Sequence, residues 1–168
     1  NIKHIGNLKF IETGEIKQNN KINKLNKMFR DKKIWVASST HNDEEKFCAK
    51  AHIELKRKIE NLLTVIIPRH IHRIPKIIEE IKKLNLNYIL HSQNLKNLKN
   101  VDIYLVDTFG ETNKFHKMAS SVFLGGSIIK RGGQNPLEAA RHGAKILHGP
   151  NVDNFKDIYK MLKSFKVS

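Results

Sequence analysis

Several features are scarce in this 168-residue sequence, and each scarcity narrows what the protein can be. Cys48 is the single cysteine, so no disulfide can form within the chain, and a reducing compartment such as the cytoplasm is expected. No run of about 18 apolar residues occurs, so no segment is predicted to span a membrane. Aromatic residues make up only 7% of the chain, and few are interleaved with basic residues, unlike most nucleic-acid-binding surfaces.

The common fingerprints of nucleotide and metal binding are missing as well. The sequence has no Walker loop, and no Gly-x-Gly-x-x-Gly follows the first predicted strand, which disfavours nicotinamide chemistry. The nine histidines are scattered and lack the spacing of a metal site. His70 and His72 are two residues apart and would need ligands from elsewhere, so neither a metal nor another cofactor is expected.

Positive charge is what the sequence has in excess, because 31 Lys and Arg face 16 Asp and Glu, a net charge of +15. A lysine-rich surface produced by compositional bias would explain it. Attraction to an anionic membrane surface or acceptor is a second explanation, in which each nearby Lys or Arg contributes about 1 kcal/mol. Nucleic-acid binding is the third. It is disfavoured because the basic residues are spread over the whole chain.

The order of apolar segments predicts the fold. Apolar residues make up 39% of the chain and come in strand-length blocks that alternate with helical spacing, which indicates a globular α/β domain. This alternation predicts an open, doubly wound parallel sheet of the Rossmann-like type, with helices on both faces. The predicted strands are 34–38, 63–67, 87–90, 101–106, 121–124 and 145–147. The predicted helices are 43–59, 74–84, 115–119, 136–142 and 154–162.

The first 32 residues are expected to lie outside the main domain. The chain opens at Asn1 inside what reads as a structured segment, so a piece of a longer protein is expected. Residues 18–27 are rich in Asn and Lys and predict a linker or a poorly packed helix. We therefore assign 1–32 to an interdomain segment and linker, and 33–168 to the main domain.

One predicted helix has recognisable internal features. Within 43–59, apolar residues recur every four positions, and the acids Asp43, Glu44 and Glu45 suit the positive end of a helix. Thr40 or Asn42 is expected to cap its start.

Ligands of doubly wound sheets bind beyond the carboxyl ends of the strands, which directs attention to the loops found there. Residues 38–41 (SSTH) follow the first strand, and their hydroxyls and free N–H groups suit a phosphate. The alternative is an ordinary cap beside a surface His. Pro68-Arg69-His70 follow the second strand, and the planar guanidinium of Arg69 suits a phosphate too. A plain surface Arg is the alternative there.

The loop after the fourth predicted strand is residues 107–111 (DTFGE). Gly110 permits a close approach of the backbone or a positive φ, and Glu111 stands at a helix start, where a carboxylate is favoured. The loop suits contact with a base or a ribose, or it is a simple capping turn.

The loop after the fifth strand carries the most specific signal. Two glycine pairs, Gly125-Gly126 and Gly132-Gly133, bracket a short stretch, and a helix opens after Asn135. Glycine N–H groups and a helix N-terminus together predict an anion cradle. Glu138, one turn into the helix, is placed to accept hydrogen bonds from ribose hydroxyls. A capping box is the alternative, although capping does not require two glycine pairs.

Taken in order, these segments resemble the transferases of 3-deoxy-D-manno-octulosonic acid (Kdo), which are two-domain glycosyltransferases of the GT-B fold. The resemblance covers most of the chain. The matching segments are 6–10 (GNLKF), 35–41 (WVASSTH) with Glu44 and Glu45, 65–70 (VIIPRH), 106–111 (VDTFGE), 122–127 (VFLGGS), 132–140 (GGQNPLEAA) and Gly149-Pro150 before Asn154-Phe155.

The resemblance implies that this chain is the C-terminal, donor-binding half of such an enzyme. It implies CMP-Kdo as donor and a lipid A precursor as acceptor, in lipopolysaccharide biosynthesis at the cytoplasmic face of the bacterial inner membrane. It implies Lys9 as a catalytic cation that offsets charge on the donor's carboxylate or departing phosphate. The donor-binding residues by this reading are Pro68, Arg69, Phe109, Gly110, Glu111, Ser127, Gly132, Gly133, Asn135, Pro136, Leu137 and Glu138, with Thr40, His41 and His70 as further phosphate or sugar contacts.

The chain departs from the family pattern in two respects. Gln134 stands where the family usually has His, and Ala139 stands where it often has Pro; Gln134 cannot carry charge, which argues against acid–base chemistry at this position. The general base, the acceptor site and the membrane anchor belong to an N-terminal domain in the family, so this chain alone is expected to be inactive. Two other functions stay open: a GT-B enzyme with a UDP- or GDP-sugar donor, and a basic nucleic-acid-binding module.

Overall fold

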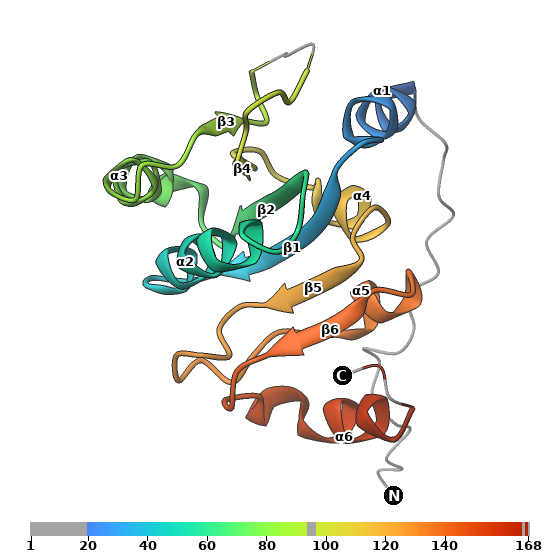
Figure 1. Ribbon diagram of the computed structural model, residues 1–168. Coiled ribbons are helices and arrows are strands. Elements are labelled where there is room, and N and C mark those ends of the chain that lie inside the picture. Colours follow the sequence, from blue (N-terminus) through green and yellow to red (C-terminus); the bar gives the residue numbers. More distant parts are fainter. Residues whose placement is uncertain (1–19, 94–96, 166, 168) are drawn as a thin grey trace, which may run out of the picture.

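The computed structural model describes residues 20–93, 97–165 and 167, with side chains of the first helix described from Leu25 onward. Its centre is a parallel sheet of six strands in the order β3-β4-β2-β1-β5-β6 (Figure 1). The predicted doubly wound parallel sheet is therefore confirmed. The strands are β1 (Lys33–Thr40), β2 (Leu62–Pro68), β3 (Tyr88–Leu90), β4 (Ile103–Leu105), β5 (Ser121–Leu124) and β6 (Lys145–His148).

Helices cover both faces of this sheet. Alternate side chains of a strand point to opposite faces, so Val36 joins one core cluster and Trp35 and Ala37 join the other. The first cluster contains side chains of α1, α4, α5 and α6, and the second contains those of α2 and α3. The helices are α1 (Asn20–Phe29), α2 (Glu44–Lys56), α3 (Ile74–Lys83), α4 (Thr112–His116), α5 (Leu137–Arg141) and α6 (Lys156–Ser164), with 3-10 turns η2 (Ile71–Arg73) and η3 (Asp153–Phe155).

The interior strands are buried on both faces, which explains why they appear as apolar runs in the sequence. Every residue of β2 is buried, as expected for a parallel strand that is covered on both faces. Cys48 is fully buried in α2, and burial raises the pKa of its thiol. It is therefore the inert, buried residue that a lone cysteine in a helix predicts.

Among the described residues, no helix is both long and apolar enough to cross a membrane.

The stretch that predicted a linker or a poorly packed helix is better packed than expected. It lies largely in α1, whose Leu25 and Phe29 are buried in the core. The ring of Phe29 lies edge-on to Tyr104, with centroids 5.1 Å apart, and to Phe115, at 6.2 Å. The polar composition misleads here because two apolar residues four positions apart are enough to anchor a short helix. The division between 1–32 and 33–168 stays a prediction.

The start of α2 differs from the prediction. Its N-cap residue is Asp43, with φ of 71°, and no side chain caps the helix. Thr40 is buried at the end of β1, and Asn42 donates to the neighbouring Asp43 carboxylate, so neither forms the expected cap. The backbone N–H of His41 instead donates to Glu44 Oε2 at 2.9 Å.

The four-residue apolar spacing in α2 does not mark its buried face. Phe47 is 54% exposed and Leu55 is 37% exposed, whereas two glutamates of the same helix are buried. Phe47 and Leu55 line a groove of about 860 Å³ together with Trp35, Phe123 and Leu147. Hydrophobic periodicity failed here because charged side chains occupy positions that face the protein interior.

Candidate functional site

The predicted site loops gather at one edge of the sheet. All six strands are parallel, and β4, β2, β1 and β5 are consecutive neighbours, so their carboxyl ends meet at the same edge (Figure 1). Arg69 follows β2, Gly110 follows β4, and Glu138 lies in α5, which follows the β5 loop. α5 lies beside α4, where His142 Nε2 is 2.6 Å from Asn113 Oδ1. Lys9 and the segment 6–10 lie outside the described residues.

The end of β1 and the residue that follows it have two polar groups without a hydrogen-bond partner in the described structure. Thr40 is fully buried and its Oγ1 is unpaired, as is Nε2 of the half-buried His41. Burial is the main cause that lowers the pKa of His41, although the Glu44 carboxylate acts in the opposite direction. The neutral imidazole is therefore favoured near pH 7, and it can serve as a hydrogen-bond donor or acceptor.

The loop after β2 lies directly beside it. The N–H of Arg69 donates to the Thr40 carbonyl at 2.9 Å, while Pro68 is buried and the side chains of Arg69 and His70 are exposed. The His70 ring meets His41 edge-on at 5.9 Å between centroids and stacks on His72 at 5.5 Å.

Basic side chains from three loops surround a small cavity. It has a volume of about 210 Å³, and it lies between the loops that follow β1, β2 and β5. Such a cavity, lined mostly by groups that donate hydrogen bonds or carry positive charge, suits a carboxylate or a phosphate. The lining residues are His41, Asn42, His70, Arg73, Ile129 and Arg131.

The loop after β4 offers an exposed ring and an exposed stretch of backbone. Phe109 is 74% exposed. Gly110 has φ of +78° with open space around it, a conformation that favours glycine. Glu111 is the N-cap residue of α4, as its predicted place at a helix start requires. Its carboxylate pairs with Lys114 Nζ at 2.5 Å and lies 3.7 Å from His91 Nε2.

The glycine pairs after β5 are required by packing of the loop itself. A Cβ on Gly125 would lie 2.3 Å from the Ser39 carbonyl oxygen, so no other residue fits there. Gly132 has φ of +77°, and a Cβ on it would lie 2.4 Å from the Asn154 side chain. The loop therefore needs glycine at these positions whether or not a ligand binds.

Several N–H groups of the loop that predicts an anion cradle already have partners within the protein. The N–H groups of Gly126 and Ser127 already donate to the Glu44 carboxylate, at 2.7 and 3.1 Å. The N–H of Gly133 donates to the Gly126 carbonyl at 2.9 Å. The Gly126 and Ser127 N–H groups thus bind an internal carboxylate, so a bound phosphate would depend on side chains such as Arg69.

Ser127, which is predicted to contact the donor, also has partners within the protein. Its side chain is fully buried, its Oγ donates to the Leu124 carbonyl, and it accepts the Gly149 N–H at 2.9 Å. The hydroxyl thus connects the β5 loop to the β6 loop. Pro136 and Leu137 are buried as well.

Helix α5 is shorter than the predicted 136–142. It has five residues, and Asn135 Oδ1 accepts the Leu137 N–H at 3.1 Å, so Asn135 makes the capping contact although Pro136 is the N-cap residue. Little dipole accumulates over one turn, so this helix adds little to anion binding. Glu138 lies half-buried in that turn.

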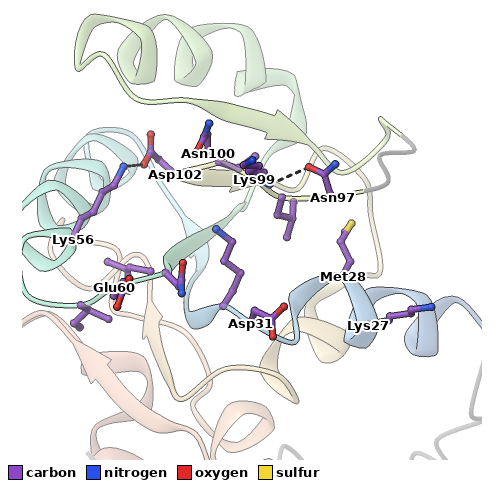
Figure 2. Close-up of a pocket in the computed structure, with 15 residues that line it drawn as sticks. Lys27, Met28, Asp31, Lys56, Glu60, Asn97, Lys99, Asn100 and Asp102 are labelled. Carbon is purple, nitrogen blue, oxygen red and sulfur yellow. Dashed lines mark hydrogen bonds and ion pairs between the residues drawn. The ribbon is translucent and has the colours of Figure 1, made fainter.

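A larger cavity lies at the opposite edge of the sheet and contains none of the predicted site residues. It has a volume of about 930 Å³ and lies near Leu62, the first residue of β2 (Figure 2). Figure 2 shows Lys56 directed toward Asp102, with which it forms an ion pair. Across the described ranges, no three His, Cys, Asp or Glu side chains are grouped so that they could hold a metal ion.

Comparison with known proteins identifies related sequences. The chain is 34% identical to a 3-deoxy-D-manno-octulosonic acid transferase of Haemophilus influenzae, over 94% of this chain and 37% of the relative. It is 35% identical to the transferase of the same name from Rickettsia prowazekii, over 94% of this chain and 34% of the relative. The chain thus spans about a third of the length of these curated relatives. No protein-family model matches it.

A solved structure shares the fold. It is the C-terminal CMP-Kdo binding domain of WaaA from Acinetobacter baumannii, with a TM-score of 0.79 and 24% identity. The match covers 86% of this chain and 77% of that domain. A bifunctional glycosyltransferase/methyltransferase of Fusobacterium nucleatum is 29% identical over 99% of this chain and 26% of its own length.

Proposed function

We propose that the chain supplies the part of a 3-deoxy-D-manno-octulosonic acid transferase that binds CMP-Kdo, which its 34% and 35% identity to two such transferases supports. One observation carries the proposal. Loops that match the Kdo transferase pattern in sequence follow four neighbouring strands of a parallel sheet and meet at its carboxyl edge, where doubly wound sheets bind their ligands.

The proposed contacts divide the donor among the loops. The exposed guanidinium of Arg69 contacts the phosphate of CMP. The backbone around Gly110 and the exposed ring of Phe109 contact the base or ribose, because both are open to solvent. Glu138 and Asn135 contact the ribose hydroxyls.

The small basic cavity is assigned to the acidic part of the donor. Kdo carries a carboxylate, and the cavity that includes His41, His70 and Arg131 offers donors and positive charge on several sides. The unpaired Nε2 of His41 gives one hydrogen bond there without requiring protonation.

The proposed reaction of the whole enzyme is an inverting transfer. A carboxylate of another domain deprotonates a hydroxyl of the lipid A precursor, which attacks the anomeric carbon of Kdo, and CMP leaves. Arg69 stabilises the charge on the departing phosphate, and Lys9 is the proposed second cation. The net charge of +15 would favour approach to the anionic inner membrane. The chain alone is expected to bind CMP and to transfer nothing.

Calorimetric titration with CMP tests this assignment. Arg69→Ala and Glu138→Ala should each weaken CMP binding about tenfold or more, because hydrogen bonds to charged groups contribute about 1.5–3 kcal/mol. Arg57→Ala is the matched control, since Arg57 is an exposed residue that pairs with Glu54 on α2. Equal CMP affinity in all four proteins would contradict the site.

A further inference from the structure

Two consecutive glutamates at the start of α2 are buried at the proposed site. Glu44 is 0% exposed and Glu45 is 1% exposed. Removing an ionised carboxylate from water costs several kcal/mol unless hydrogen bonds or an ion pair offset it. The hydrogen-bond donors around each carboxylate therefore show which parts of the structure it holds together.

Glu44 is surrounded by backbone donors from two loops. Its Oε2 accepts the N–H of His41 at 2.9 Å and of Gly126 at 2.7 Å. Its Oε1 accepts the N–H of Ser127 at 3.1 Å and of Ile128 at 3.0 Å. Each carboxylate oxygen thus accepts two N–H groups, and the side chain fixes the β5 loop against the β1 loop.

Glu45 fixes a third loop. Its two oxygens accept both ends of the Arg73 guanidinium, at 2.7 and 2.9 Å. Such a forked pair fixes orientation as well as distance, and the hydrogen bond that Arg73 donates to Glu45 is the main cause that raises the pKa of Arg73. Arg73 ends η2, directly after Arg69 and His70, and it lines the small basic cavity.

We propose that Glu44 and Glu45 are positioning residues that hold the loops after β1, β2 and β5 in the arrangement that receives the donor. Neither carboxylate is accessible, so both act through the loops they hold. Glu44 orients the β1 loop, which contains His41, relative to the β5 loop, which contains Arg131. Glu45 orients Arg73 and the turn after Arg69. The identity of the ligand rests on the proposed function, whereas the immobilisation of the loops does not.

Glu44→Gln tests the first of these contacts because it keeps the shape of the side chain. The amide NH2 of Gln would face two backbone N–H donors that now meet an oxygen. We expect CMP to bind at least tenfold more weakly, with an unchanged far-UV circular dichroism spectrum. Glu45→Gln, which leaves Arg73 without its charged fork, should weaken binding about threefold to tenfold.

Two control variants separate positioning from general stability. Glu54→Gln alters an exposed glutamate of the same helix and should leave both stability and CMP affinity unchanged. Ile81→Val removes a buried methyl group in α3, outside the site, and should lower the melting temperature while CMP affinity stays within twofold. A folded Glu44→Gln protein that binds CMP within twofold of wild type overturns the proposal.

Hydrogen exchange on the unliganded wild-type chain gives a readout that needs neither variant nor ligand. The amides of Gly126, Ser127 and Ile128 should exchange at least a hundredfold more slowly than that of Gly110, in a loop whose glycine is exposed. Exchange of all four at similar rates overturns the proposal even where Glu44→Gln fails to fold. Protected amides in a wild-type chain that does not bind CMP would instead contradict the proposed function alone.

Discussion

The two edges of the sheet both contain buried charged or titratable side chains. These side chains connect strands and helices at the amino edge but connect loops at the carboxyl edge. At the amino edge, Asp102 accepts hydrogen bonds from Lys56 and from the Asn87 N–H at 2.8 Å, and lies 3.4 Å from His52 Nε2. His52 Nδ1 is 2.8 Å from Thr64 Oγ1. These contacts connect strands and helices. At the carboxyl edge, Glu44 and Glu45 connect loops.

This difference teaches that cavity size does not identify the site. The larger cavity, about 930 Å³, lies at the amino edge, where the Asp102 carboxylate is already satisfied by protein groups. The small cavity of about 210 Å³ at the carboxyl edge has an unpaired imidazole nitrogen and several basic groups. Unsatisfied hydrogen-bonding capacity therefore distinguishes the candidate site better than volume does.

The largest expected effect is a loss of folding stability at low pH, caused by a histidine near the carboxyl edge. Burial is the main cause that lowers the pKa of His116 to about 4. The unfolded chain binds this proton below pH 6.5 and the folded chain does not, so stability is lost as pH falls from about 6.5 to about 4. The loss from this residue is about 3 kcal/mol.

Urea unfolding at pH 7 and pH 4 measures this effect. His116→Gln should remove about half or more of the pH dependence, and the rest should include His52, whose pKa burial also lowers. An unchanged pH dependence in the variant would mean that the titration of His116 contributes nothing to stability.

The next largest effect is thermal stabilisation by a nucleotide, which distinguishes a CMP-linked donor from a UDP- or GDP-linked one. CMP at about a hundred times its dissociation constant should stabilise the chain by about 2.7 kcal/mol, which raises the melting temperature by about 5–10 °C. UDP and GDP at the same concentration should raise it less. A larger shift with UDP or GDP would favour the alternative GT-B donor and reject CMP-Kdo.

A smaller effect is expected at the amino edge. Asp102→Asn removes the charge that pairs with Lys56, and it should destabilise the fold by about 2 kcal/mol. CMP affinity should remain within twofold of wild type, because this side chain lies beyond the amino end of β4. Weaker CMP binding in a folded Asp102→Asn protein would contradict the claim that only the carboxyl edge takes part in CMP binding.

The fold could be predicted from the sequence because interior parallel strands appear as apolar runs. The structure has β5 at the predicted residues 121–124, and β1 extends the predicted 34–38 by one residue before and two after. The ends of helices were predicted less accurately. The structure has α4 at Thr112–His116, whereas the predicted helix was 115–119. Helix boundaries depend on local hydrogen bonds that the apolar pattern does not record.

The candidate site was only partly predictable. The loops could be located because the parallel topology fixes which strand ends meet. The roles of Glu44 and Ser127 could not be found, because their partners lie 82 positions and 22 positions away in the sequence. The glycine-rich loop suggested an external anion, whereas the described contacts show an internal carboxylate on its N–H groups.

Chemical-shift mapping of CMP binding by NMR tests the central claim most directly. We predict that CMP shifts the backbone signals of Arg69, Gly110 and Glu138 at the carboxyl edge and leaves those of Lys56 and Asp102 unchanged. Shifts confined to the residues around the amino-edge cavity, or no shifts at millimolar CMP, would contradict the account.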